Sequence, residues 1–234
     1  MQNKLLVIII AVVAALLLIG GGIAVYFVMN ANKPVNNTPA PTAGPESEPA
    51  GAETAVQPAA TSSTNEAAGK QSSTTGQNNN LGQLITKDAF SLQAPDGWQE
   101  AQAPTGVLFM LVNNSEQVTN AVAKQAGFKT YLSVIRDNLG SNTKENYLTA
   151  LQNGLKQALP GVTFTKDNST SIGGQPADVL EASVFQQGIN FKALMFVISG
   201  KDKDVWIVAF NTLSENFSAY KNLFYQIAGS FKLK

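Results

Sequence analysis

The stretch "INFKALMFVISGKDKDVWIVAFNT", residues 189–212, contains two apolar runs joined by the polar turn Gly200–Asp204. Each run has the length of a strand, and a connection this short forces neighbouring strands to run antiparallel. Residues 205–210 have no polar interruption, which is typical of a central strand that is covered on both faces. The pair therefore predicts an antiparallel sheet packed between two layers.

Strand patterns continue upstream of this pair. The segment "GGQPADVLEASVFQQG" begins with the turn residues Gly173-Gly174 and ends at Gln187-Gly188, and "VTFTKDNSTSI" precedes it. These short turns extend the antiparallel meander. Three earlier segments also have strand patterns: "LITKDAFSLQAP" at 84–95, "TGVLFMLVNN" at 105–114 and "FKTYLSVIRDNL" at 128–139. Residues 116–127 fit either a loop or a short helix.

Two helices interrupt the strands. "NTKE", residues 142–145, has the form of a capping box with Asn142 as N-cap and Glu145 at the third helical position. Apolar residues then follow at helical spacing until Pro160-Gly161. A second helix begins near Ser214 or Asn216 and ends at Gly229 or in a short strand-like tail. Its aromatic stripe is typical of a core face and consists of Phe217, Tyr220, Phe224, Ile227 and Phe231.

These elements predict an α+β fold, an antiparallel sheet with helices on opposite faces. The "PDGW" turn, the strand–helix pair "TYLSVIRDNLG…ENYLTALQNGLKQAL", the "IGGQPADVLEAS" turn, "VWIVAFNT" and the terminal "FSAYKNLFYQIAGSFKLK" resemble the PsbP/DcrB-like superfamily. The resemblance implies an extracytoplasmic α/β/α sandwich without catalytic activity, acting as an accessory or assembly protein. The histidine positions of the photosystem members have no counterpart here, because the chain has no histidine.

The stretch "APDGW" raises the question of a binding turn. Pro95 fixes φ and Gly97 permits a positive φ, which favours a plain β-turn. We expect Trp98 to pack over the sheet edge, and an exposed contact residue is the alternative.

The N-terminal region predicts a membrane anchor. Residues 5–29 are uncharged and apolar, longer than the roughly 20 residues that span a bilayer. A cleavable signal peptide has a shorter apolar core, and the processing site and glutamate of a type IV pilin are missing. We expect residues 1–4 in the cytoplasm and the rest outside, in the periplasm or at the cell surface. Residues 30–81, rich in Pro, Ala, Ser, Thr and Asn, then form a disordered linker, and 82–234 the folded domain.

Composition excludes several function classes. Lys and Arg number 16 against 16 Asp and Glu, so no basic field favours nucleic acid. Cysteine and histidine are both absent. Thiol chemistry, disulfides, Ser-His-Asp hydrolysis and most zinc sites are thereby excluded.

Several residue pairs could be mistaken for sites. Gly173-Gly174 lacks the lysine and helix start of a phosphate loop, so a hairpin turn is favoured. Asp202 and Asp204 alternate with lysines, which favours a solvated turn over a calcium site. Asp178 and Glu181 lie three apart on a strand and face opposite sides. Ser133 and Ser183 have no base to activate them.

We therefore predict no catalytic, metal or cofactor-binding residues, no cofactor and no enzymatic activity. The favoured function is a membrane-tethered interaction module that works with an envelope protein. The alternative is a small-ligand binder, or a hydrolase without histidine, that uses a cleft between sheet and helix. An exposed apolar patch would favour the first function, and a concave pocket with converging polar groups and perturbed carboxylates would favour the second.

Overall fold

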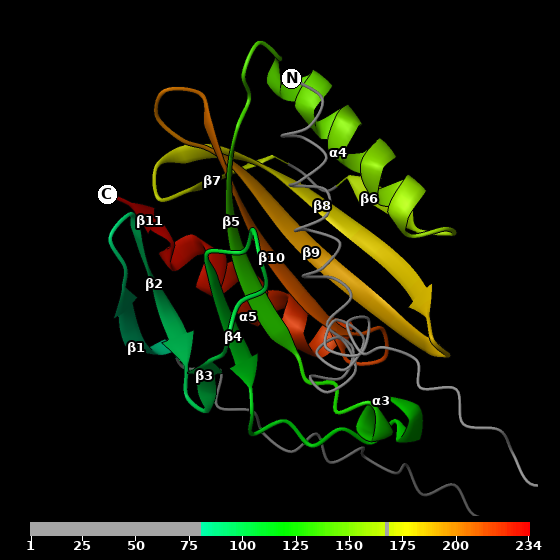
Figure 1. Ribbon diagram of the computed structural model, residues 1–234. Helices are drawn as coiled ribbons and strands as arrows, with labels where there is room; N and C mark the ends of the chain where they lie inside the picture. Colours follow the sequence, from blue (N-terminus) through cyan, green and yellow to red (C-terminus); the bar gives the residue numbers. More distant parts are fainter. Residues whose placement is uncertain (1–80, 167–168) are drawn as a thin grey trace, which may run out of the picture.

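The computed structural model describes residues 81–166 and 169–234. An eight-stranded antiparallel sheet forms its centre, with the strands in the order β3-β4-β5-β10-β9-β8-β6 and β7 beside β8 (Figure 1). The strands are β3 (Trp98–Glu100), β4 (Phe109–Asn113), β5 (Tyr131–Asn138), β6 (Thr163–Lys166), β7 (Thr170–Ile172), β8 (Gln175–Gln186), β9 (Ile189–Ser199) and β10 (Asp204–Leu213).

The β8–β9–β10 meander confirms the sequence prediction. β10 lies between β5 and β9, with Ile207 opposite Ile135 on one side and Val197 on the other. All residues of β10 after Asp204 are buried. Side chains on both faces of this strand are buried because a helix packs on each face of the sheet.

Two of the expected strands are each divided in two. The segment 84–95 forms the hairpin β1 (Leu81–Thr86) and β2 (Phe90–Pro95), because the polar residues between them reverse the chain, with the Lys87 N–H donating to Phe90 O. β1 and β2 form a second sheet with β11 (Lys232–Leu233). The segment 162–172 likewise gives β6 and β7, which both pair with β8.

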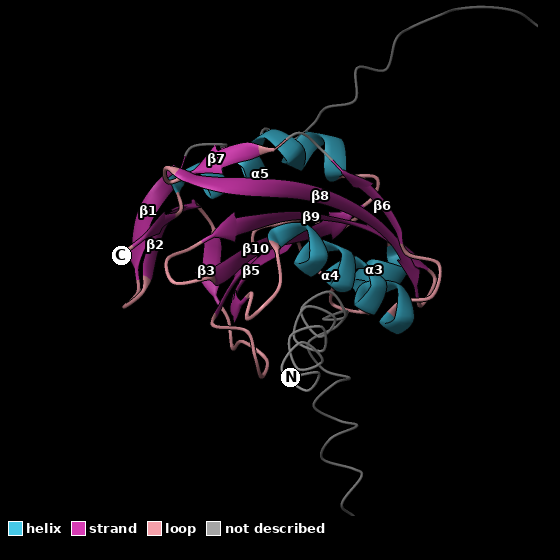
Figure 2. Cartoon of the chain, turned by 90° about the horizontal axis from the view of Figure 1, so that it is seen from above, coloured by secondary structure: helices cyan, strands magenta, loops and turns pink. Residues whose placement is uncertain are grey.

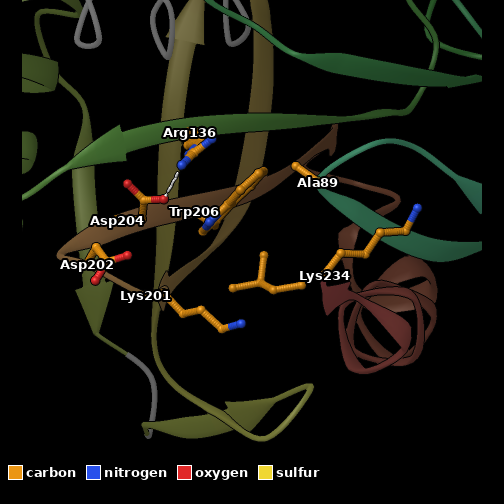
Figure 3. A pocket seen from close by; sticks show the side chains of 8 residues that line it. Ala89, Arg136, Lys201, Asp202, Asp204, Trp206 and Lys234 are labelled. Atoms are coloured by element: carbon orange, nitrogen blue, oxygen red, sulfur yellow. Dashed lines mark hydrogen bonds and ion pairs between the residues drawn. The ribbon is translucent and has the colours of Figure 1, made fainter.

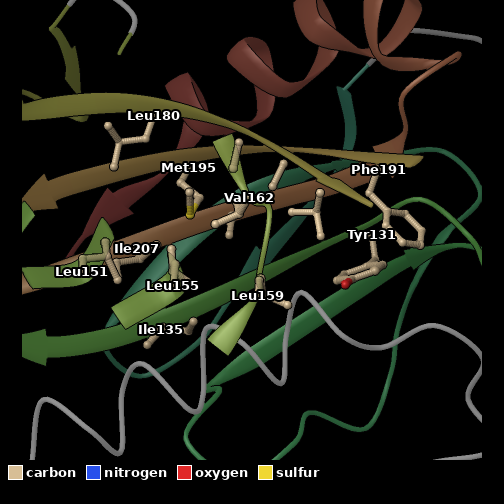
Figure 4. Close-up of a cluster of buried hydrophobic side chains, with 14 of the residues drawn as sticks. Tyr131, Ile135, Leu151, Leu155, Leu159, Val162, Leu180, Phe191, Met195 and Ile207 are labelled. Carbon is tan, nitrogen blue, oxygen red and sulfur yellow. The ribbon is translucent and has the colours of Figure 1, made fainter. Parts of the chain in front are cut away.

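One face of the large sheet carries α4 (Lys144–Ala158) and the short helix α3 (Ala121–Gln125); we call it the α4 face (Figure 2). The expected capping box on Asn142 is wrong. Thr143 is the N-cap and accepts from Asn146 N, while Asn142 Nδ2 donates to Leu139 O. Leu151, Leu155 and Leu159 pack onto the sheet from this side (Figure 4).

The opposite face, here the α5 face, carries α5 (Phe217–Ser230). All five members of the expected aromatic stripe are buried. Phe224 stacks on Phe210 of β10 at 4.6 Å between ring centroids and on Tyr220 at 5.5 Å. The small sheet closes the same core, with Phe90 stacked on Phe231 at 5.3 Å. The two helices therefore cover opposite faces, as predicted.

The expected membrane helix, residues 5–29, and nearly all of the expected linker, 30–81, lie outside the described residues. β1 begins at Leu81, one residue before the domain boundary expected from the sequence. Within 81–166 and 169–234, no helix combines the length and hydropathy needed to cross a bilayer.

Candidate functional site

Gly173 and Gly174 form the turn between β7 and β8, with φ of 55° and 81°. A Cβ on Gly173 would lie 2.5 Å from Phe231 O, so the turn packs closely against the start of β11. Positive φ and this close approach account for both glycines as a hairpin turn.

Asp178 and Glu181 lie on opposite faces of β8 and are not brought together. Asp178 Oδ2 is 2.8 Å from Lys144 Nζ of α4. Glu181 accepts from Lys192 Nζ at 2.5 Å and from Lys221 Nζ of α5 at 3.3 Å. Each carboxylate therefore pairs with lysine on its own side of the sheet.

Neither serine has catalytic surroundings. Ser133 is fully buried on the α4 face, and its Oγ makes no hydrogen bond. Ser183 lies opposite Thr163 in the β6–β8 ladder. Trp98, in turn, is buried on the edge strand β3 and follows a turn in which Gly97 has φ of 82°, so it packs as expected.

Asp202 and Asp204 lie in the β9–β10 turn. Asp202 and Lys203 have φ of 50° and 66°, and Asp204 N donates to Lys201 O, which is a type I′ turn. Asn138 Nδ2 and Lys203 Nζ bond this turn to the end of β5. Among residues 81–166 and 169–234, no group of three or more His, Cys, Asp or Glu residues could hold a metal ion.

This turn is one wall of an open pocket of about 220 Å³ (Figure 3). Trp206 of β10 forms its floor. The Arg136 guanidinium lies 5.4 Å from the indole ring, and Phe90 and Phe231 contact the indole at 5.9 and 6.0 Å between centroids. The pocket is lined by Ala89, Arg136, Lys201, Asp202, Asp204, Trp206, Leu233 and Lys234.

The indole of Trp206 is held in one position. A Cβ on Gly200 would lie 3.0 Å from both Trp206 Nε1 and Cδ1, so the absence of a side chain there lets the turn close over the ring. Trp206 itself is only 3% exposed. The aromatic floor is thus preformed.

Two of the five charged side chains that line the pocket form an ion pair, and a third donates to a backbone carbonyl. Asp204 Oδ2 accepts from Arg136 Nε at 2.9 Å and from Nη2 at 2.5 Å. Lys234 Nζ donates to Lys87 O at 2.5 Å. Arginine does not titrate in the physiological range, and the pocket has no histidine. Its chemistry therefore fits charge recognition better than proton transfer.

A buried polar network on the α5 face was missed by the sequence reasoning. Glu116, 4% exposed, accepts from Thr130 N at 2.5 Å, Thr130 Oγ1 at 2.8 Å and Tyr220 OH at 3.2 Å. Asn216 Nδ2 adds a bond at 3.4 Å, and Thr212 Oγ1 lies 2.8 Å from Thr130 Oγ1. Glu116 belongs to the segment that fitted either loop or helix, and no periodicity marked it as buried. Because the carboxylate is enclosed and fully bonded, we interpret the network as structural.

No protein-family model matches the chain, and no curated protein sequence matches it significantly. Solved structures are similar in fold. LpqN of Mycobacterium tuberculosis, described as involved in cell envelope biogenesis, is 15% identical with a TM-score of 0.48, covering 62% of this chain and 83% of LpqN. Cyanobacterial PsbP of Synechocystis sp. PCC 6803 is 18% identical with a TM-score of 0.47, covering 65% and 92%. Protein PA94 of Pseudomonas aeruginosa, described as a putative regulator, is 17% identical with a TM-score of 0.44, covering 63% and 94%. A PsbP is thus among the structures found.

Proposed function

We propose that this protein is a membrane-tethered, extracytoplasmic accessory module that binds an envelope protein and has no catalytic activity of its own. The apolar run at 5–29 and the polar segment after it support the tether. The single observation that supports binding is the pocket beside Trp206, where a fixed aromatic floor is surrounded by charged side chains.

The charges of the described residues support recognition over catalysis. Carboxylates that a hydrolase without histidine would need are engaged elsewhere, Asp178 with Lys144, Glu181 with two lysines and Asp204 with Arg136. The alternative function requires a cleft between sheet and helix. The cavity described above lies instead between the β9–β10 turn and β11.

The contact surface of this proposal is small and charged, and it differs from the exposed apolar patch that the sequence analysis expected of an interaction module. The large apolar side chains that are exposed, Leu84, Leu108, Val122 and Phe185, come from β1, the β3–β4 connection, α3 and β8. A partner would therefore contact a polar surface around one pocket, which is typical of accessory complexes that form and separate.

In-cell photocrosslinking of the full chain tests the function. A photoreactive amino acid in place of Lys201 should capture a specific envelope protein. The same amino acid in place of Lys156, exposed at the last turn of α4, should not capture it. Equal capture from both positions, or none from either while the purified chain retains a small molecule, contradicts the proposal.

A further inference from the structure

We propose that the pocket beside Trp206 binds one acidic side chain of the partner protein, with Lys201 as its counter-charge. This inference rests on the proposed function and names the chemistry of the partner. It depends on three features of the pocket: an unpaired ammonium group, an apolar wall and an excess of one basic side chain.

Lys201 provides the unpaired cation. Its ammonium has no hydrogen bond or ion pair within the described part of the chain, although its carbonyl accepts from Asp204 N. Other lysines that the described part leaves without a partner, such as Lys124 and Lys232, do not line the pocket. Figure 3 shows the Lys201 side chain below Trp206 in this view, with Arg136 above the ring. Because its turn is bonded to β5, the ammonium is presented from a fixed backbone.

The wall beside this ammonium is apolar. Ala89, Leu233 and the Trp206 indole line the pocket together. A glutamate or aspartate side chain has methylene groups that such a wall can cover while the carboxylate meets Lys201. The volume of about 220 Å³ is below the roughly 300–1,000 Å³ of pockets for drug-sized ligands, so it fits one side chain better than a whole metabolite.

The charge balance favours a monoanion. Three basic and two acidic side chains line the pocket, an excess of one basic side chain. Arg136 uses Nε and Nη2 on Asp204, and its remaining N–H groups can donate to a second acceptor. The Asp202 carboxylate, which has no partner within the described residues, would repel a dianion such as phosphate more strongly than a single carboxylate.

Tryptophan resonances offer a direct test on the full chain, which has two tryptophans. Trp98 is three strands away from Trp206 in the sheet, at least about 14 Å, and serves as an internal control. With indole ¹⁵N labelling, the peptide N-acetyl-Ala-Glu-Leu-amide, added up to about 10 mM, should shift the Trp206 indole N–H saturably. The Trp98 signal should stay in place, and the glutamine peptide should shift neither.

Variants locate the effect in the pocket. Lys201→Ala should weaken binding of the glutamate peptide by about threefold to fivefold, the upper range for loss of an exposed ion pair. Lys232→Ala, an exposed lysine of β11 outside the pocket, should leave binding unchanged. Asp202→Asn should tighten binding because it removes a negative charge from the pocket. The variant should keep the turn, since asparagine tolerates the positive φ at this position. An unchanged Trp98 signal in each variant shows that it is folded.

Three results would overturn the inference: equal shifts from the glutamine peptide, undiminished binding by Lys201→Ala, or acetate binding as tightly as the peptide. The last would mean that any small carboxylate enters. If crosslinking captures an envelope partner while the peptide fails, only this inference is lost. If no partner is captured and the purified chain retains a small molecule, the proposed function fails whatever the peptide does.

Discussion

The two faces of the large sheet bury similar numbers of apolar side chains but treat their polar groups differently. On the α5 face, Glu116, Thr130, Thr212 and Tyr220 bond to one another. Five buried polar atoms on the α4 face have no hydrogen-bond partner among the described residues. Strand alternation assigns four of these residues to this face, and the fifth lies on α4. The five atoms belong to Ser133, Asp137, Tyr147, Gln186 and Asn211.

A buried polar atom without a partner costs about 1–3 kcal/mol, whereas a bonded one contributes modestly to stability. The polar groups of the α5 face therefore hold its side chains in one arrangement more strictly than those of the α4 face do. The stacked aromatic rings of the α5 face restrict the arrangement further. The pocket is built from that half, since Trp206, Phe90 and Phe231 all belong to the α5-face core. A recognition site benefits from such support because its side chains must be held in place before the partner arrives.

The largest effect should come from removing a ring of the α5 face. Phe224→Ala leaves a cavity between Phe210 and Tyr220 and should cost about 3–5 kcal/mol in the free energy of unfolding. Urea unfolding of the full chain, followed by near-ultraviolet circular dichroism, measures it. Leu155→Ala, equally buried on the α4 face, is the matched control and should cost less. The reverse order would contradict the comparison.

Glu116→Ala should destabilise the protein by about 2–4 kcal/mol, because it leaves Thr130 N, Thr130 Oγ1 and Tyr220 OH buried without their acceptor. Glu116→Gln keeps the shape and one acceptor oxygen, so it should cost less. The same urea titration compares the two variants. Equal stability of wild type and Glu116→Ala would mean that the network does not stabilise the α5 face.

Asp137 gives the α4 face a pH dependence of stability. Burial raises the pKa of Asp137 from its ordinary value of 3.8, while the Asn138 N–H and the nearby Tyr147 hydroxyl, which falls short of hydrogen-bond geometry, lower it. The folded state thus holds this proton to higher pH than the unfolded state. The contribution of Asp137 to folding stability is therefore fully present below pH 3.8. It is lost as the pH rises through the raised pKa of the folded state.

Asp137→Asn should accordingly stabilise the protein at neutral pH, with a gain that fades as the pH falls toward 3.8. Urea unfolding across this pH range measures the difference between variant and wild type. Tyr147→Phe removes the hydroxyl that lowers this pKa, so the pKa of Asp137 rises further. The stability of this variant should therefore fall with rising pH over a wider range than that of the wild type. A gain that is independent of pH would show that Asp137 does not titrate as inferred.

Sequence patterns sufficed where periodicity carries the information. The run at 205–210 predicted a strand covered on both faces, and the stripe from Phe217 to Phe231 predicted the packing of α5. They failed where side chains and backbone groups compete locally. The bend at 87–89 divides one expected strand, and Thr143 replaces Asn142 as N-cap because Asn142 bonds back to Leu139.

The candidate site was beyond sequence reasoning because its parts are far apart in the chain. Ala89, Arg136, Trp206 and Leu233 meet only when β11 returns to pair with β2. The turn at 200–204 was predicted to be solvated, and its residues 201–203 are exposed. Nothing in the local sequence indicates that Lys201 and Trp206 line one pocket, or that Arg136 pairs with Asp204 and leaves that lysine unpaired.

The smallest expected effect comes from removing single buried hydroxyl groups, and the sign of the change in unfolding free energy tests the contrast between the two faces. Ser133→Ala removes a hydroxyl that is buried without a partner, so it should leave stability unchanged or raise it by up to about 1 kcal/mol. Thr212→Val is the matched variant on the α5 face. It removes a hydroxyl bonded to Thr130 Oγ1 and should cost about 1 kcal/mol. Opposite signs of the change in unfolding free energy, measured in urea, would establish the difference between the faces. A loss of stability in Ser133→Ala would instead show that this hydroxyl is hydrogen-bonded, for example to a bound water. It would remove one of the five atoms on which the comparison depends.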